Sequence, residues 1–289
     1  MNPYRYKWRN MKNEEVMRRL DVDGWCLIEG VIPDGEVDKI REAVLAEEAS
    51  KRDEQDAVKA KIRAQGHRIS VTGVGSFRGL IESMPEVASY IVDERILNAA
   101  EGLFGPYVRV STVNGLVNRP GTGRGYWHSD WPFNQTVESH IPAPYPDAAM
   151  HMSSLFMLSS FDVENGGTLI VPGSHRSPNN PSGENGVDRD APNPEELNVT
   201  GRPGDMFIYD SRLWHSVAEN NSDQPRVAMV VRYAPWWLNL NVQLEGHPDH
   251  IRIVVETKGK DSINPPISAE VFDSLPANAK PLFAHWVSG

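Results

Sequence analysis

The sequence changes character near Tyr107, and this change most limits how the chain can fold. Before residue 106, apolar residues recur at helical spacing, as Val37, Ile40 and Val44 do at i, i+3 and i+7. After it, short β-rich runs alternate with turns rich in Gly, Pro, Asn and Asp. Helices followed by a block of strands favour one domain, in which the helices pack on one side of a β-sandwich or barrel.

The expected elements follow from these patterns. Helices are expected at 13–20, 33–64 and 83–105, the second continuing into a charged, solvated segment at 46–64 and the third opened by a capping box at Ser83. Strands are expected at 24–30, 108–118, 126–131, 150–158, 168–171, 206–209, 214–218 and 227–233. We divide the single domain, 1–289, into a helix-rich part (1–106), a β core (about 107–235) and a C-terminal extension (236–289).

The stretch Tyr126–Trp131 carries His128 and Asp130 two residues apart. On a strand, residues i and i+2 point to the same face, so the imidazole and the carboxylate would project into one space. Such a pair forms part of the 2-His-1-carboxylate triad that holds non-haem Fe(II). His215 is the best candidate for the third ligand. Isolated pairs of this kind are common and a lone histidine is usually structural, so the argument rests on the order of these residues along predicted strands.

Arg226 follows His215 and opens the predicted strand Arg226–Tyr233. Its planar guanidinium suits a bidentate carboxylate. The sequence thus supplies a metal site and a cationic anchor for an acid that could chelate the metal. The alternative is a surface arginine paired with Asp223 or Glu219.

Composition excludes several classes of protein. The chain has 29 Lys plus Arg against 39 Asp plus Glu, and its net charge of −10 argues against nucleic-acid partners and acidic membranes. No apolar run approaches the ~20 residues of a membrane span, and residues 1–17 lack the apolar core of a secretory signal. Cys26 is the sole cysteine, which excludes an intrachain disulfide and fits the cytoplasm. We expect a monomer or a homodimer.

A long segment, Gly173–Pro203, is rich in Pro, Asn, Gly and Asp. Loops of this length are either functional or peripheral insertions. We expect a lid beside the barrel mouth that orders when substrate binds, with a surface insertion without a role as the alternative.

Several segments resemble the phytanoyl-CoA dioxygenase family of Fe(II)/2-oxoglutarate oxygenases, and together they cover most of the chain. They are Asp23–Val37, Asn118–Gly121, Trp127–Trp131, Glu164–His175, Gly204–Asp210, His215 and Arg226. Each segment alone is a weak signal, but the combination is specific.

The resemblance implies a mainly β fold, a double-stranded β-helix (a cupin-like jelly roll) with flanking helices. It implies Fe(II) held by His128, Asp130 and His215, with 2-oxoglutarate as co-substrate and O2 as oxidant. Arg226 would bind the C5 carboxylate of 2-oxoglutarate. Family members often place Ser or Thr two residues after the distal histidine to assist, but here that position is Val217.

Other candidate site residues have weaker signals. Asn114 and Thr168 are candidate contacts to the co-substrate. Aromatic residues are mostly core, but Trp131, Phe133 and Trp214 are candidates for lining a substrate pocket. His175 lies within a family motif, and we expect it to make a structural hydrogen bond.

We therefore expect an oxidoreductase that couples decarboxylation of 2-oxoglutarate, giving succinate and CO2, to hydroxylation or another oxidation of an unactivated C–H bond in a small-molecule metabolite. Two alternatives are a cupin-like metalloenzyme that does not use 2-oxoglutarate and a non-catalytic jelly-roll binding module. Arg226 argues against the first, and the complete ligand set argues against the second. A coenzyme A thioester would need basic residues for its phosphates, for which 51–68, Arg119 and Arg124 are candidates, but the net charge favours a free metabolite.

Overall fold

Two antiparallel sheets face each other in the computed structural model, which describes residues 13–69, 71–133, 141, 143–181, 187–260 and 263–287. The larger sheet has the order β1-β7-β4-β9-β3-β2 and the smaller has the order β6-β5-β8. The strands are β1 (Trp25–Ile28), β2 (Val74–Arg78), β3 (Arg109–Asn118), β4 (Met152–Met157), β5 (Thr168–Ile170), β6 (Leu197–Val199), β7 (Met206–Asp210), β8 (His215–Val217) and β9 (Arg226–Ala234). The sheets approach closely, because the Tyr209 ring on β7 lies 4.9 Å from the His215 ring on β8. The predicted jelly-roll core with flanking helices is confirmed.

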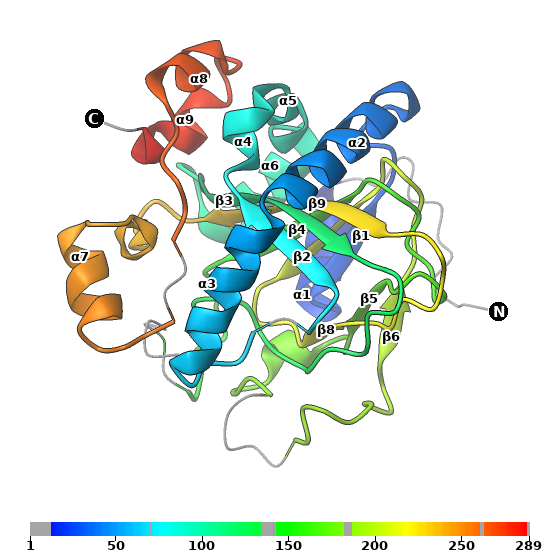
Figure 1. Cartoon of the computed structure of the whole chain (residues 1–289). Helices are drawn as coiled ribbons and strands as arrows, with labels where there is room; N and C mark the ends of the chain where they lie inside the picture. The colour runs from blue at the N-terminus through cyan, green and yellow to red at the C-terminus, as the bar shows by residue number, and fades with distance from the viewer. Residues whose placement is uncertain are drawn as a thin grey trace.

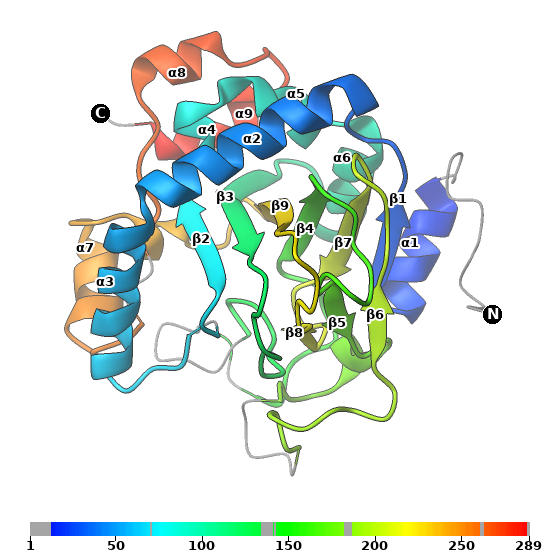
Figure 2. The same ribbon diagram turned by 45° about the vertical axis from the view of Figure 1, so that its right-hand side comes forward.

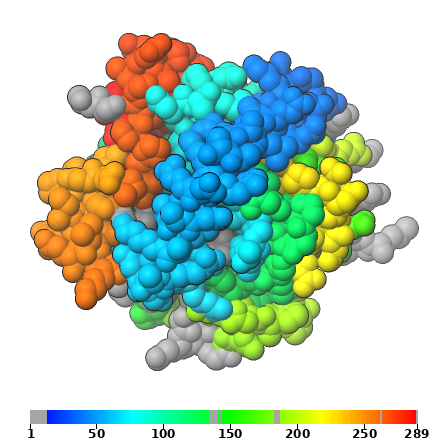
Figure 3. All heavy atoms as spheres, viewed as in Figure 1, coloured from blue at the N-terminus to red at the C-terminus, as the bar shows by residue number. Residues whose placement is uncertain are grey.

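Helices cover the outer face of the larger sheet (Figures 1 and 2). In the space-filling view, α2 and α3 form a continuous diagonal band across this face (Figure 3). The N-terminal helices are α1 (Asn13–Val22), α2 (Asp34–Ser50), α3 (Arg52–Ala64), α4 (Leu80–Ser83), η2 (Pro85–Val87), α5 (Ala88–Ile91) and α6 (Glu94–Phe104). Within the described ranges, no helix is both long and apolar enough to cross a membrane.

Strand β9 shows why one face of the larger sheet belongs to the hydrophobic core and the other carries polar side chains of the candidate site. Val227, Met229, Val231 and Tyr233 are fully buried, and the Tyr233 hydroxyl donates to the Ile91 carbonyl of α5 on the helical side. The alternate residues of a strand point the other way. Arg226 and Arg232 therefore both face the space between the sheets.

The predicted strand at 126–131 is wrong in extent. His128 forms a single β-bridge with His215, through reciprocal backbone bonds of 3.1 and 3.0 Å, and the following backbone N–H of Asp130 donates to the Ser211 carbonyl. Pro132 lacks the N–H that a longer ladder requires, which helps to explain why pairing stops here. The bridge alone nevertheless fixes the relative positions of the two histidines.

The predicted helix at 83–105 is also wrong as one element. Ser83 does not cap it, because it is the last residue of α4, and Pro85 follows. The longer helix α6 begins after Asp93, whose carboxylate accepts from the Arg95 backbone N–H as a true N-cap. The expected continuous helix at 33–64 is likewise divided, at Lys51.

The C-terminal extension packs as short helices against the edge of the barrel. They are η4 (Leu240–Gln243), α7 (Pro248–His250), the π-helical η5 (Ile251–Val255), α8 (Ala269–Ser274), α9 (Lys280–Phe283) and η6 (Ala284–Trp286). Trp286 anchors the end of the chain to the larger sheet, because its indole N–H donates 2.6 Å to the Val110 carbonyl on β3. Both ring nitrogens of its neighbour His285 are also buried.

His285 should make folding sensitive to acid. Burial, with the nearby Arg109 cation, lowers the pKa of His285 to about 3, whereas a histidine in an unfolded chain titrates near ~6.5. Between these values the unfolded chain binds more protons, so stability falls as the pH falls below about 6.5 and is unaffected above it. Relative to His285→Phe, the wild type should lose about 1 kcal/mol of unfolding free energy per pH unit between about pH 5.5 and 4. Urea titrations at several pH values measure this difference, and parallel pH profiles would contradict it.

Candidate metal centre and co-substrate pocket

Three side chains predicted as metal ligands converge between the two sheets. One ligand atom each from His128, Asp130 and His215 lies within 4.8 Å of the other two. The centroids of the two imidazole rings are 4.2 Å apart, as the β-bridge between the histidines requires. Two imidazoles and one carboxylate form the donor set that non-haem Fe(II) uses.

Both histidines are oriented by their own backbone. The Nδ1 atoms of His128 and His215 lie 3.1 and 2.9 Å from the carbonyls of Tyr126 and Leu213, two residues earlier in each case. A carbonyl can only accept a hydrogen bond, so each Nδ1 carries the proton and each Nε2 keeps a free lone pair. Nε2 of His215 lies 3.8 Å from Oδ1 of Asp130. The tautomers are therefore those that metal binding needs.

The Asp130 carboxylate is held on both oxygens. Oδ2 accepts from the Ser153 hydroxyl at 2.8 Å and from the Tyr209 hydroxyl at 3.0 Å, and Oδ1 accepts from Nη2 of Arg232 at 2.8 Å. Burial tends to raise the pKa of Asp130, but Arg232 and the two histidines outweigh it and hold the pKa well below its usual range. The group is an anion at neutral pH.

The register of the larger sheet places these partners in one row. Ser153 on β4 lies opposite Tyr209 on β7 and opposite Arg232 on β9. Directly opposed residues on neighbouring strands point to the same face. The three hydrogen-bond donors therefore reach Asp130 together. Ser153 and Tyr209 are not among the site residues predicted from the sequence, although a serine inside a predicted buried strand is a usable signal.

Burial keeps the histidines neutral. It is the largest cause that lowers the pKa of His128 to about 3, with the neighbouring His215 as the next cause. Burial also lowers the pKa of His215, against the opposing effect of Asp130. Neutral imidazole is the form that coordinates a metal, so little competition from protons is expected near pH 7.

Arg226 is a buried cation that has no counter-ion in the part of the chain that the structure describes. It is 1% exposed, its Nε donates 2.9 Å to the Gly166 carbonyl, and its guanidinium lies 4.6 Å from the Phe161 ring centroid. Its Nη1 is buried and has no hydrogen-bond partner among the described residues. Neither Asp223 nor Glu219 pairs with it, so the surface alternative is not what the structure has. Burial lowers its pKa to about 10, which leaves it protonated at neutral pH.

A buried, unpaired guanidinium between the two sheets is what a binding site for a ligand carboxylate requires. Leaving a buried charged donor unsatisfied costs several kcal/mol unless a ligand supplies the acceptor. The facing residue on β3 is Asn118, whose Oδ1 is also buried without a partner. Arg226 and Arg232 lie on the same face of β9, one toward each end of the space between the sheets. The residues present therefore fit a metal together with a bound dicarboxylic acid.

The two weaker co-substrate candidates lie on inward faces. Asn114 is opposite Val230 of β9, between the two arginines in register, and its Oδ1 accepts 2.6 Å from the Thr112 hydroxyl. Thr168 on β5 is opposite Val217 and is buried on the same side as His215. Their contact with 2-oxoglutarate stays a prediction. Val217 offers no hydroxyl at this place, as its sequence position indicated.

The three aromatic candidates differ in what they can contact. Trp131 is partly buried, with its ring edge-on to His151 at 5.6 Å, and stays a candidate. Phe133 is fully buried against Tyr145, so it has no free surface for a substrate. Trp214 packs with a separate cluster on the opposite face of β8 from His215, and its indole N–H donates to the Asn179 carbonyl. These positions favour Trp131 over the other two, and contact between any of the three and a substrate stays a prediction.

Two further expectations concern the segment 173–203. His175 is buried and hydrogen-bonded to the Asp21 carbonyl at 3.1 Å, so its predicted structural role is confirmed. The segment carries η3 (Ser174–Arg176) and β6, and its residues 182–186 lie outside the described residues. Whether it acts as a lid stays a prediction.

Comparison with known proteins gives the family. The sequence model of the phytanoyl-CoA dioxygenase (PhyH) family matches residues 20–228. An ectoine dioxygenase from Nocardia farcinica is 26% identical over 243 residues, which are 76% of this chain and 76% of that protein. Dioxygenase af480 from Aspergillus fumigatus is 29% identical over 159 residues, 52% of this chain but only 47% of that protein.

Solved structures share the fold. EctD from S. alaskensis with bound Fe has a TM-score of 0.57 and 21% identity, covering 80% of each chain. HygX from Streptomyces hygroscopicus with nickel and 2-oxoglutarate has a TM-score of 0.56 and 18% identity, covering 83% of this chain and 94% of that one. The chain belongs to the phytanoyl-CoA dioxygenase family. It is therefore an Fe(II)/2-oxoglutarate-dependent dioxygenase, with O2 as the oxidant.

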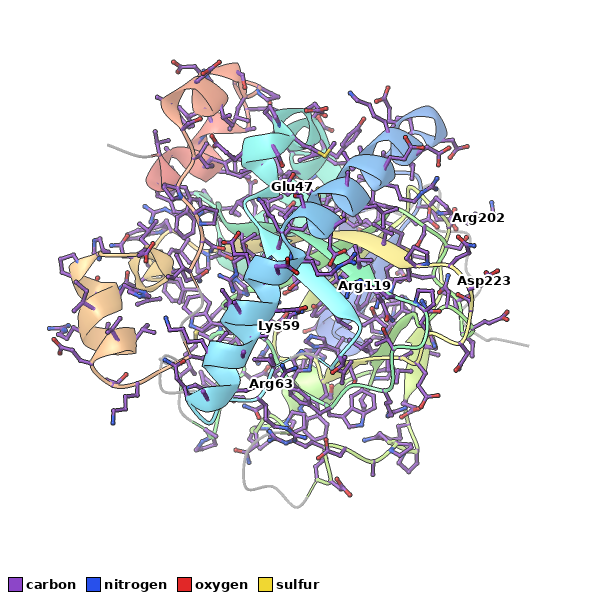
Figure 4. All side chains as sticks on the ribbon, in the orientation of Figure 1. Glu47, Lys59, Arg63, Arg119, Arg202 and Asp223 are labelled. Carbon is purple, nitrogen blue, oxygen red and sulfur yellow. The ribbon has the colours of Figure 1, made fainter. Side chains whose placement is uncertain are left out.

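Each of the variants His128→Ala, Asp130→Ala and His215→Ala should lose metal. Each removes one of three protein ligands, and we expect the affinity for Fe(II) to fall by more than about 100-fold, with turnover abolished and the fold retained. Anaerobic calorimetric titration measures the affinity, and circular dichroism checks the fold. Asp223→Ala is the matched control, because Asp223 is an exposed carboxylate that is not one of the three converging side chains (Figure 4). If His215→Ala still bound metal with the wild-type affinity, the third ligand would have to be another histidine.

Proposed function

We propose that this dioxygenase oxidises an unactivated C–H bond of a small-molecule metabolite, with His128, Asp130 and His215 holding iron and Arg226 binding the distal carboxylate of 2-oxoglutarate. The observation that carries the proposal is the buried Nη1 of Arg226. No described residue accepts a hydrogen bond from it, and Arg226 lies on the strand whose Arg232 also supports Asp130. A buried cation of this kind needs an anion to complete it.

The protein's own residues prepare the site before any ligand arrives. The carbonyls behind Nδ1 of His128 and His215 aim both Nε2 atoms inward, and Arg232 with two hydroxyls fixes Asp130. When bound, iron and 2-oxoglutarate supply the activation of dioxygen, and the co-substrate leaves as succinate and CO2. Arg226 would set the co-substrate's orientation through its distal end, and the low polarity around Phe161 would strengthen that pairing.

Ligands in solved structures of the same fold support a small-molecule substrate. Solved structures of this fold include HygX with hygromycin B bound and the epimerase SnoN with nogalamycin RO bound. Those ligands belong to those proteins, and we extend to this chain only the class, a small organic molecule. The cupin-like and binding-module alternatives are set aside, because the chain belongs to a dioxygenase family and its three ligand side chains converge.

The proposal predicts a specific defect for Arg226→Ala. Loss of a buried, charge-assisted bidentate pair is worth on the order of 2–5 kcal/mol, so the KM for 2-oxoglutarate should rise by roughly 30-fold or more. The iron content should stay close to that of the wild type, because Arg226 is not a ligand. Succinate release at graded 2-oxoglutarate concentrations measures the first quantity, and metal analysis measures the second.

The exposed Arg202→Ala is the matched control for a lost positive charge. An unchanged KM for Arg226→Ala would reassign the anchor, with Arg232 the next candidate on the same face of β9. Iron loss as large as the KM effect would mean that Arg226 supports the metal centre instead.

A further inference from the structure

A second cavity lies beside the metal centre, between the end of α3 and the turn at 120–126. Its volume is about 830 Å³, within the range of small-molecule sites. The chemically active residues that line it are Arg63, His67, Arg68, Arg124, Tyr126 and Asp190. None of them belongs to the metal triad or to β9, so the cavity is distinct from the place assigned to 2-oxoglutarate.

Tyr126 joins this cavity to the metal centre. It lines the cavity, and it precedes His128 by two residues, with the two ring centroids 5.3 Å apart. The guanidinium groups of Arg68 and Arg189 lie over the Tyr126 ring at 4.7 and 5.4 Å from its centroid. A molecule in the cavity would therefore be one aromatic side chain away from His128.

The lining of the cavity is positively charged, although the whole chain carries −10. Three arginines line it against one aspartate. Arg68 pairs with Asp190 at 2.8 Å and Arg124 pairs with Glu196 at 2.6 Å, but Nε of Arg124 is buried and has no hydrogen-bond partner in the described ranges. These two pairs leave a net surplus of cation.

Arg63 is the arginine of the cavity lining whose positive charge is not balanced by an ion pair with a described residue. It lies in the last turn of α3 with an exposed side chain, and no ion pair holds it within the ranges that the structure describes. Basic groups from α3, from the loop after it and from the 120–126 turn thus line one opening. Concentrated charge of one sign in a cleft attracts ligands of the opposite sign.

We propose that this cavity binds an acidic group of the substrate, a carboxylate or a phosphate ester, so that the substrate is an anion whose oxidised carbon reaches past Tyr126 to the metal. The inference rests on the proposed function for the identity of the reaction, but not for the binding itself. Guanidinium groups match the planar geometry of carboxylate and phosphate oxygens.

Binding of three aryl probes to the full-length protein tests this, without iron or 2-oxoglutarate present. The probes are phenyl phosphate, benzoate and the neutral benzyl alcohol, followed by ligand-observed NMR titration. At least one acid should bind with a Kd in the millimolar range, far more tightly than the alcohol, and the stronger of the two acids identifies the group. Arg63→Ala/Arg68→Ala should weaken that acid by about tenfold or more, the effect of losing hydrogen bonds to charged groups.

Two further variants keep the result interpretable. Arg63→Glu reverses one exposed charge that has no ion pair to lose, so it should fold and should weaken the acid at least as much as removal of the charge does. Arg202→Ala, at an exposed arginine on a different side of the molecule from Arg63, should leave binding unchanged (Figure 4).

The proposal is overturned if benzyl alcohol binds as tightly as the acids, if neither acid binds the wild type, or if Arg63→Glu binds both acids with the wild-type Kd. The binding experiment contains no metal and no 2-oxoglutarate, so its outcome does not depend on the proposed reaction. The proposed reaction is tested separately by succinate release, and a failure there would refute the reaction but not the anion site.

Discussion

The candidate metal centre depends on the fixed orientation of one buried carboxylate, that of Asp130. Asp130 would be costly to bury as an anion by itself, and it stays ionised because Arg232, Ser153 and Tyr209 donate to it from three neighbouring strands. That row of donors exists because β7, β4 and β9 pair in a fixed register, so a shift of one residue would turn all three side chains away. The geometry of the candidate metal centre is thus a direct consequence of strand pairing in the larger sheet.

Strand β9 links stability to chemistry. Its odd-numbered residues from Val227 to Tyr233 fill the core beneath the helices, and this packing stabilises the orientation of the even-numbered arginines on the other face. Arg232 pairs with the candidate metal ligand Asp130, and Arg226 is buried with no counter-ion among the residues that the structure describes. Burying the unpaired Arg226 guanidinium costs folding free energy, and we interpret this cost as preparation for an anionic ligand. A binding site formed in advance avoids the cost of rearrangement on binding. The basic cavity near Tyr126 extends the same electrostatic character to the surface.

Much of this could be predicted from the sequence, and the failures have physical causes. The three ligand candidates and Arg226 were identifiable because their residue types and chain order carry the chemistry. The strand around His128 was overestimated, because a single bridge suffices to place a ligand and periodicity cannot show where pairing stops. Ser153 and Tyr209 were missed because their role arises from register between strands distant in sequence. The role of Phe133 stays a prediction, because proximity to a ligand along the chain does not decide whether a side chain points to the pocket or to the core.

The central claim is that β9 provides two arginines with different tasks, Arg232 for the metal ligand Asp130 and Arg226 for the co-substrate. A crystal structure of the chain grown without oxygen, with Mn(II) in place of Fe(II) and with 2-oxoglutarate, measures this most directly. The account predicts the metal on Nε2 of His128 and His215 and on Asp130, with the distal carboxylate of 2-oxoglutarate on Nη1 of Arg226. A distal carboxylate bound to Arg232 with Arg226 still unpaired, or a metal away from these three residues, would contradict it.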